Sequence, residues 1–141
     1  MKARVHYVSP KGAAETIAEV LARECKCVKE PLLPAYMPEN VAIMFLGCEG
    51  TKADKTTLEF INSLNKNRVA NAALYCCNPK KSDAPIAQMK AALEARGVNV
   101  MSQTFVAPCK GMFGGKNPGE AECAEAKEFA QKVIKELFPD A

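Results

Sequence analysis

The chain has 141 residues, 48% of them hydrophobic, which fits one domain over residues 1–141 with a substantial buried core. Its formal net charge is only +3, and its Lys and Arg residues are spread among acidic ones, so the composition argues against nucleic-acid binding. No segment is long and apolar enough to cross a membrane, and no basic-then-apolar leader opens the chain, so we expect a cytoplasmic protein with no membrane attachment.

The first half of the chain alternates strand and helix patterns. Lys2–Val8 is mostly apolar and predicts a strand covered on both faces, and a helix is predicted from about Gly12 to Cys25. A short strand around Cys27–Lys29 follows, and then a loop through Pro31–Pro38, whose prolines exclude a regular helix. Val41–Gly47 is uniformly apolar and predicts the central strand.

After a loop at Cys48–Lys52, the second half continues the alternation. Its apolar positions predict, in order, a helix from near Asp54, a strand over Arg68–Cys77, a helix from about Pro85, a strand over Val98–Val106 and a last helix to about Phe138. Gly97 suits the left-handed residue that ends a helix. The segment Asn117–Glu120 predicts the start of the last helix, with Asn117 as the cap and a proline in the first turn.

Five strands that alternate with helices predict a parallel sheet covered by helices on both faces. With right-handed crossovers and a strand order of 2-1-3-4-5, the fold class is α/β, a doubly wound five-stranded parallel sheet. Ligands bind such sheets outside the carboxyl ends of the strands, where the strand order reverses. The loops that follow the first, third and fourth strands are therefore the expected binding region.

The turn between the first strand and the first helix carries the clearest functional signal. The strand breaks at Ser9-Pro10 and the helix begins at about Gly12, so backbone N–H groups and the helix dipole converge on one point. A phosphate group is the ligand best matched to such a point. Ser9 adds a hydroxyl donor, Lys11 adds a charge, and Gly12 lets the backbone approach closely. An ordinary strand-to-helix turn is the alternative interpretation.

This segment resembles the phosphate loop of flavodoxins, in which a strand leads into Ser/Thr-x-Thr-Gly-x-Thr and then a helix. Ser9, Gly12 and Ala18 match that pattern, whereas Lys11 and Ala14 stand where hydroxyl residues are usual. The similarity to small flavodoxins extends over nearly the whole chain. The later segments that resemble the family's loops are Gly47–Thr51, Pro108–Phe113 and Asn117–Pro118.

The resemblance implies a flavodoxin-like fold and an FMN-binding electron carrier that passes electrons to a partner reductase. It favours such a carrier over an enzyme with its own substrate. We also expect a monomer or a weak dimer. The resemblance further implies that the phosphate lies on the first loop and the ring between the next two, with the Gly50 peptide turned toward the flavin and the charge of Glu49 making it a stronger reductant. The residues implied to bind the cofactor are Ser9, Pro10, Lys11, Gly12, Ala13, Ala14, Gly47, Cys48, Glu49, Gly50, Cys77, Asn78 and Pro79.

The two loops expected around the ring, Gly47–Thr51 and Cys76–Asp83, contain no aromatic residue, although flavodoxins usually stack a Trp or Tyr on the flavin. Met112 or Phe113 in the last loop is the available substitute. Two other functions stay open. One is a flavin-free flavodoxin-like binding or regulatory module. The other, less favoured by the short chain, is a quinone-type reductase that uses NAD(P)H.

The thiols and the single histidine allow other chemistry. The 7 Cys residues, an odd number without a secretory signal, favour reduced thiols. Cys48, Cys77, Cys109 and Cys123 are all predicted at the carboxyl end of the sheet, where a thiol redox role or a soft-metal site competes with simple packing, which we favour. His6, in the middle of a strand, is interpreted as a core histidine rather than a catalytic base.

Overall fold

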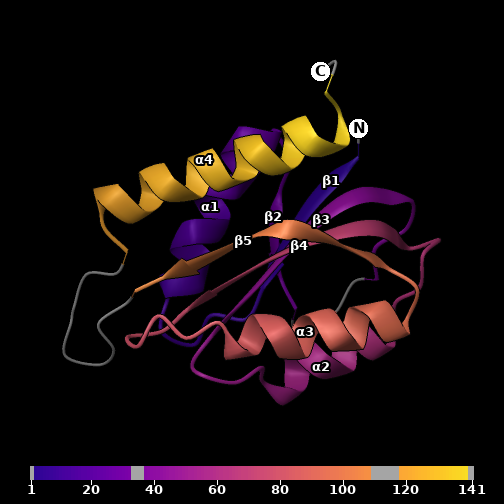
Figure 1. The fold of residues 1–141 in the computed structure, drawn as a ribbon, viewed down its shortest axis with the longest axis horizontal. Coiled ribbons are helices and arrows are strands. Elements are labelled where there is room, and N and C mark those ends of the chain that lie inside the picture. The colour runs from indigo at the N-terminus through magenta and orange to yellow at the C-terminus, as the bar shows by residue number, and fades with distance from the viewer. Residues whose placement is uncertain (1, 33–36, 109–117, 140–141) are drawn as a thin grey trace.

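The computed structural model describes residues 2–32, 37–108 and 118–139. Strands and helices alternate along the chain (Figure 1). In order, the elements are β1 (Ala3–Tyr7), α1 (Ala13–Cys25), β2 (Lys29–Pro31), β3 (Val41–Glu49), α2 (Lys55–Asn62), β4 (Val69–Cys77), α3 (Ala84–Ala95), β5 (Asn99–Ala107) and α4 (Glu120–Leu137).

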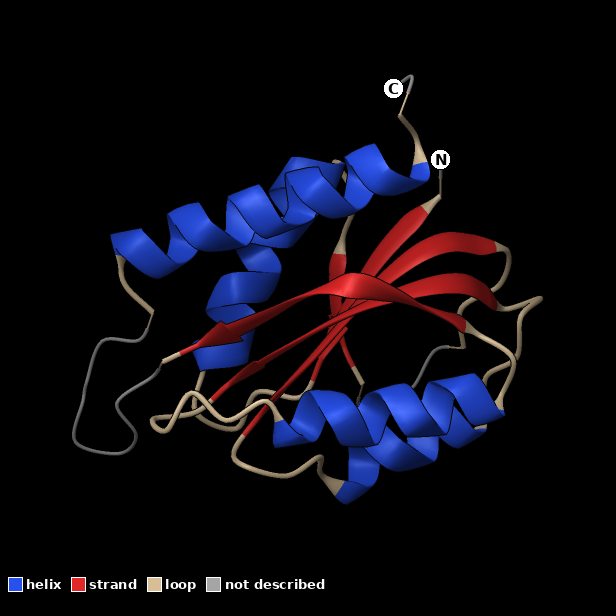
Figure 2. Ribbon diagram, in the orientation of Figure 1, coloured by secondary structure: helices blue, strands red, loops and turns tan. Residues whose placement is uncertain are grey.

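The five strands form one parallel sheet in the order β2-β1-β3-β4-β5, which confirms the predicted fold class and strand order. Helices α1 and α4 cover one face and α2 and α3 cover the other (Figure 2). Because all strands are parallel, their carboxyl ends meet at one edge of the sheet. The loops after β1, β3 and β4 lie at that edge.

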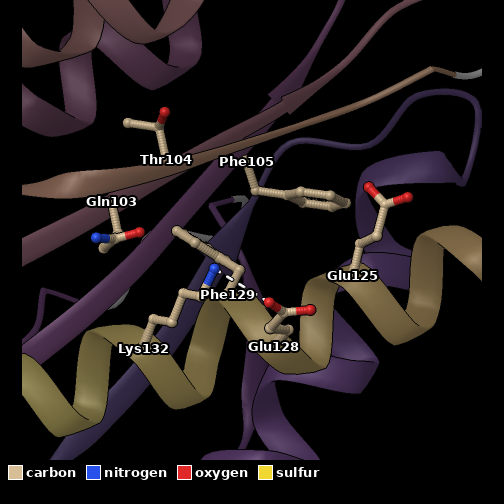
Figure 3. A pocket seen from close by; sticks show the side chains of 7 residues that line it. All are labelled: Gln103, Thr104, Phe105, Glu125, Glu128, Phe129 and Lys132. Atoms are coloured by element: carbon tan, nitrogen blue, oxygen red, sulfur yellow. Dashed lines mark ion pairs between the residues drawn. The ribbon is translucent and has the colours of Figure 1, made fainter.

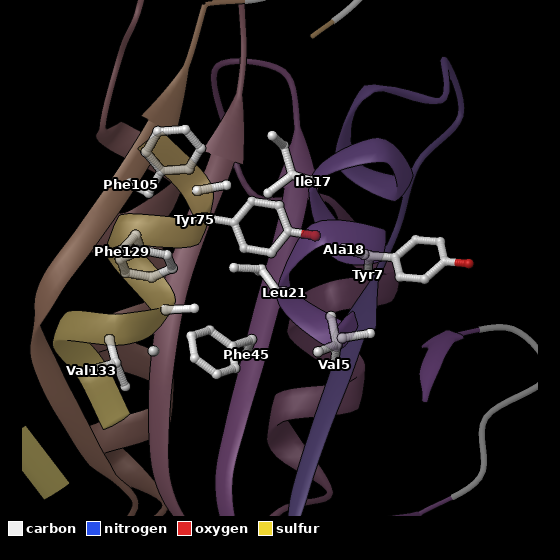
Figure 4. Close-up of a cluster of buried hydrophobic side chains, with 14 of the residues drawn as sticks. Val5, Tyr7, Ile17, Ala18, Leu21, Phe45, Tyr75, Phe105, Phe129 and Val133 are labelled. Atoms are coloured by element: carbon white, nitrogen blue, oxygen red, sulfur yellow. The ribbon is translucent and has the colours of Figure 1, made fainter. Parts of the chain in front are cut away.

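Each face of the sheet has its own core. On the α1 and α4 face, Phe129 contacts Phe45 edge-on and stacks against Phe105, with ring centroids 5.6 and 5.9 Å apart (Figure 4). The opposite face is filled from α2 and α3, with Ile61 and Met89 fully buried. Helix α3 buries Ile86, Met89 and Leu93.

Three predicted boundaries are wrong, each for a different reason. The short second strand is Lys29–Pro31 rather than Cys27–Lys29, because Lys26 adopts a left-handed conformation and the Cys27 N–H bonds back to the Ala22 carbonyl, which ends α1. The third strand continues two residues beyond Gly47, since Cys48 and Glu49 still pair with β4.

The predicted start of the last helix is also wrong. Asn117 lies outside the described residues, and the N-cap is Gly119, whose N–H donates to the Glu122 side chain at 2.7 Å. An acid three residues into the helix reaches back to the cap, so Glu122 and not Glu120 has that role. By contrast, Gly97 follows α3 with φ of +80°, as predicted.

Helix α2 depends on the cap provided by Asp54. One oxygen of its carboxylate accepts from the Thr57 N–H at 2.9 Å and the other from the Thr57 hydroxyl at 2.7 Å. Because Thr57 is buried, nothing replaces these bonds when the carboxylate is removed. We expect Asp54→Ala to lower the free energy of unfolding by about 1 kcal/mol, measured by urea denaturation. Asp54→Asn retains a good cap and serves as the control, so an equal loss in both variants would contradict the capping role.

Candidate anion and cofactor site

The loop between β1 and α1 is shaped by a left-handed glycine. Gly12 is the N-cap of α1 with φ of +88°, and its N–H bonds to the Ser9 carbonyl at 3.3 Å. A Cβ added at Gly12 would meet nothing within 4 Å. No protein atom would therefore oppose a side chain at Gly12, and the close approach of its backbone to a phosphate stays a prediction. The positive φ, which L side chains rarely adopt, is the reason for a glycine here.

Ser9 fixes the first turn of α1 from within the loop. Its hydroxyl oxygen accepts a hydrogen bond from the Glu15 N–H at 2.9 Å, which satisfies one of the unpaired donors at the start of the helix. The hydroxyl hydrogen remains available, and it points to a carboxylate, that of Glu49, at 2.5 Å. Ser9 is thus hydrogen-bonded both to the first turn of α1 and to the Glu49 carboxylate.

The Glu49 carboxylate is held by three donors of this loop. Its Oε2 accepts from the Ser9 hydroxyl and from the Ala14 N–H at 2.9 Å, and its Oε1 accepts from the Lys11 N–H at 2.9 Å. Two backbone amides and one hydroxyl from a helix N-terminus thus converge on one negatively charged group. These donors converge on one anion, as predicted for the loop, and in this structure the anion is the carboxylate of the protein's own Glu49.

The sheet brings Glu49 to the loop. Strand β3 lies between β1 and β4, and the Val8 N–H bonds to the Gly47 carbonyl at 3.1 Å, which sets β3 beside the end of β1. Side chains alternate along β3, so that Glu49 shares the α1 side of the sheet with Gly47, while Cys48 packs into the α2 and α3 core. The result is a contact across 40 residues of sequence.

Three of the residues implied to bind the cofactor, Gly47, Cys48 and Gly50, are engaged within the protein. Gly47 lies inside β3 beneath the ring of Tyr75, so close that a Cβ would come within 2.0 Å of Tyr75 Cζ. Cys48 is fully buried. Gly50 has φ of +95°, and its N–H donates to the Cys77 carbonyl at 3.0 Å, which continues the β3–β4 pairing past Glu49.

The loop after β4 is held by its own hydrogen bonds. Cys77 and Asn78 are fully buried, and the Asn78 side chain donates to the Ser82 carbonyl and accepts from the Ser82 N–H, each at 2.8 Å. The Asn78 N–H bonds to the Ala107 carbonyl at 3.1 Å. Pro79 is exposed. The Asn78 side chain is therefore occupied by the turn that it stabilises.

Tyr75 links the central sheet to the anion-binding loop. Its ring is fully buried and its hydroxyl donates to the Ala14 carbonyl at 2.8 Å, in the first turn of α1 (Figure 4). Burial raises the pKa of Tyr75 well above its ordinary value, so the hydroxyl stays protonated and remains a donor. Ala13 and Ala14 are buried beneath the loop, and Pro10 and Lys11 are exposed.

The thiols do not form a common site in the part of the chain that the structure describes. Cys48 and Cys77 lie on opposite faces of the sheet, and Cys109 is outside the described residues. Although a helix start generally lowers a thiol pKa, partial burial, and after it Glu122 and Glu120, raise the pKa of Cys123. Burial also raises the pKa of Cys48. Within the described ranges there is no cluster of three or more His, Cys, Asp or Glu residues suited to a metal.

His6 is a core residue, as interpreted from the sequence. It is 3% exposed, its ring lies 5.3 Å from that of Phe60, and burial lowers its pKa. Neither ring nitrogen has a hydrogen-bond partner among the residues described here.

Among the described residues, a hollow of about 320 Å³ lies beside His6, and two others lie elsewhere. One, of about 350 Å³, adjoins Ser9 on the β2 side of the loop, between Tyr7, Glu15 and Leu32. The other, of about 210 Å³, lies between β5 and α4, where Glu128 pairs with Lys132 at 3.0 Å beside Phe129 (Figure 3). The hollow beside Phe129 borders the middle of β5 rather than the carboxyl edge. Of these three, only the hollow beside Ser9 belongs to the anion site.

Sequence reasoning missed the contacts that two residues make in this arrangement. Glu49 was expected beside a flavin ring but reaches back to the first loop, and Tyr75 was expected only in a strand. A signal for Glu49 is present in the sequence. An acid ends the strand that neighbours β1, in a chain whose first loop lacks the usual hydroxyl residues at Lys11 and Ala14.

No protein-family model matches the chain, and a comparison with curated protein sequences finds no significant match. Solved structures do match along nearly the whole chain. A flavodoxin from the domain Archaea has a TM-score of 0.69 at 16% identity, over 97% of this chain and 99% of that one. Oxidised flavodoxin 2 from Bacillus cereus gives 0.69 at 14%, over 96% and 99%.

A short-chain flavodoxin associated with a non-canonical PDU bacterial microcompartment gives a TM-score of 0.72 at 12% identity, over 97% of this chain and 99% of that one. At these identities the likeness establishes the fold alone. The chain has the flavodoxin-like fold predicted from its sequence. Among its described helices, none has the length and apolar character needed to cross a membrane.

Proposed function

We propose that this protein binds FMN and acts as an electron carrier for a partner reductase. The observation that carries the proposal is the convergence of the Lys11 and Ala14 amides and the Ser9 hydroxyl on one anion. That point lies at the carboxyl edge of a doubly wound sheet, where the strand order reverses between β1 and β3.

The donor set fits a phosphate. Backbone amides at a helix start supply partial positive charge without desolvating a cation, and they bind oxyanions through short hydrogen bonds. The Ser9 hydroxyl adds a third donor, and the exposed Lys11 side chain adds a full positive charge at the rim. Gly12, Ala13 and Pro10 shape the loop around these donors.

The remaining implied residues are proposed to border the ring, with Gly50 and Pro79 exposed at the edge, Glu49 partly buried, and Gly47, Cys48, Cys77 and Asn78 buried behind them. FMN, when bound, would supply the single-electron chemistry. The chain's contribution is to hold the phosphate and to set the charge and hydrogen bonding near the ring.

A second function is favoured by a specific observation. Glu49 already satisfies the loop's donors, and the Gly50 and Asn78 N–H groups are bonded within the sheet edge. A flavin-free binding or regulatory module would have this self-satisfied edge. The two functions differ in whether an external phosphate displaces the Glu49 carboxylate.

Flavin titration separates the two functions. If the protein is an FMN carrier, it should quench FMN fluorescence and shift the visible spectrum, and it should bind riboflavin at least about 10-fold more weakly, because riboflavin lacks the phosphate that the loop holds. Riboflavin is the matched control for ring binding alone. Absence of any response at high micromolar FMN would favour the flavin-free module, and equal binding of both flavins would place the site away from the loop.

A further inference from the structure

The Glu49 carboxylate occupies the loop as an external oxyanion would. Both of its oxygens are used, Oε1 by one amide and Oε2 by a second amide and the Ser9 hydroxyl. These contacts are 2.5–2.9 Å long, the range of charge-assisted hydrogen bonds. The donors that would bind a phosphate are therefore already paired.

We propose that Glu49 is an internal ligand of this loop, which holds the donors in place when no cofactor is bound and which an incoming phosphate must displace. The inference rests on the proposed function, since it assigns regulation to the same site. It makes FMN affinity depend on a residue that competes with the phosphate instead of contacting it.

Geometry makes the two ligands exclusive. The Ala14 N–H and the Ser9 hydroxyl each have one hydrogen, and both are directed to Glu49 Oε2. A phosphate that takes them leaves Glu49 without these partners. A displaced Glu49 also stays on the neighbouring strand, so its negative charge would repel the phosphate dianion.

The carboxylate has a route out of the loop. Glu49 is only partly buried, and it is the last residue of β3. The next residue, Gly50, is exposed and has φ of +95°, so the chain turns here, after a last hydrogen bond from the Gly50 N–H to the Cys77 carbonyl of β4. Glu49 can therefore turn to solvent without disturbing the paired part of β3.

A first test uses the protein without flavin. The amide proton resonances of Lys11 and Ala14 are compared by NMR between the unaltered chain and Glu49→Ala. We expect both resonances to move upfield in the variant, because each loses a charge-assisted hydrogen bond. Resonances that move no more than those of remote residues would show that the contact does not exist in solution and would overturn the inference.

A second test measures affinity for inorganic phosphate and for FMN. We expect Glu49→Ala to bind each at least about 10-fold more tightly than the unaltered chain, with a smaller gain for Glu49→Gln, whose neutral side chain still accepts hydrogen bonds. Glu15→Gln is the control, because it removes a nearby carboxylate that pairs with Lys29 and Tyr7 and does not accept from the loop donors.

The outcomes separate the two proposals. If no variant binds FMN but Glu49→Ala binds phosphate more tightly than the unaltered chain, the proposed function fails and the role of Glu49 stands. If FMN binds equally to the unaltered chain and to Glu49→Ala, the role of Glu49 fails and the proposed function stands. An equal gain in affinity in Glu15→Gln would show that the effect comes from removing any nearby negative charge, and it would overturn the inference.

Discussion

Replacing Gly47 by alanine is expected to lower the free energy of unfolding by about 3 kcal/mol, as overpacking of a tight core does. A methyl group at Gly47 would come within 2.0 Å of Tyr75 Cζ and 2.3 Å of both neighbouring ring carbons. Tyr75 cannot move aside easily, because its ring is fully buried and its hydroxyl is bonded to the Ala14 carbonyl. Urea denaturation of the variant and of the unaltered chain measures the loss.

A double-mutant cycle shows whether the tyrosine ring causes this loss. In a Tyr75→Leu background the ring is gone, so the same Gly47→Ala change should cost much less than it does alone. An equal cost in both backgrounds would contradict the contact. The cycle also shows whether Gly47 of β3 packs tightly against Tyr75. Tyr75 in turn positions the start of α1 through its hydrogen bond to the Ala14 carbonyl.

Replacing Gly12 by valine is expected to remove anion binding and to destabilise the protein by about 1–2 kcal/mol, the cost of a left-handed conformation for an L residue. Gly12 has φ of +88°, which a β-branched side chain adopts poorly. The backbone would therefore rotate, and the Lys11 and Ala14 amides on either side would no longer point at one anion. FMN affinity should fall at least about 10-fold, measured by fluorescence quenching.

Gly12→Asn is the matched control for this change, because asparagine tolerates the left-handed conformation. A Cβ at this position meets nothing within 4 Å, so a side chain by itself does not block the loop. We expect the asparagine variant to keep most of its stability and affinity. If the valine variant binds FMN as well as the unaltered chain does, the phosphate is bound elsewhere.

The fold could be predicted because the signals for it are local. Apolar runs such as Val41–Gly47 and the helical pattern of α1 each follow from neighbouring residues, and parallel sheets of five alternating units have few arrangements. One of the boundary errors arose where pairing with another strand decides the structure. Cys48 and Glu49 remain in β3 because Cys76 and Cys77 of β4 continue beside them.

The loop was predicted as an anion site from its own residues. Its contact with Glu49 could not be predicted in the same way. The contact from Glu49 to Ala14 joins residues 35 apart, and it depends on β3 being adjacent to β1 and on which face Glu49 occupies. A shift of one residue in the strand would place Glu49 on the other face. Asn78, which is predicted beside a ring, also closes a local turn with Ser82, four residues further on.

The most direct measurement is a crystal structure of Glu49→Ala grown with FMN, in which the internal carboxylate no longer competes. We expect the phosphate within hydrogen-bond distance of the Lys11 and Ala14 amides and the Ser9 hydroxyl, in the position that Glu49 occupies in the unaltered chain. FMN bound with its phosphate away from these donors, or no FMN at millimolar concentration, would contradict an anion site for this cofactor at the start of α1.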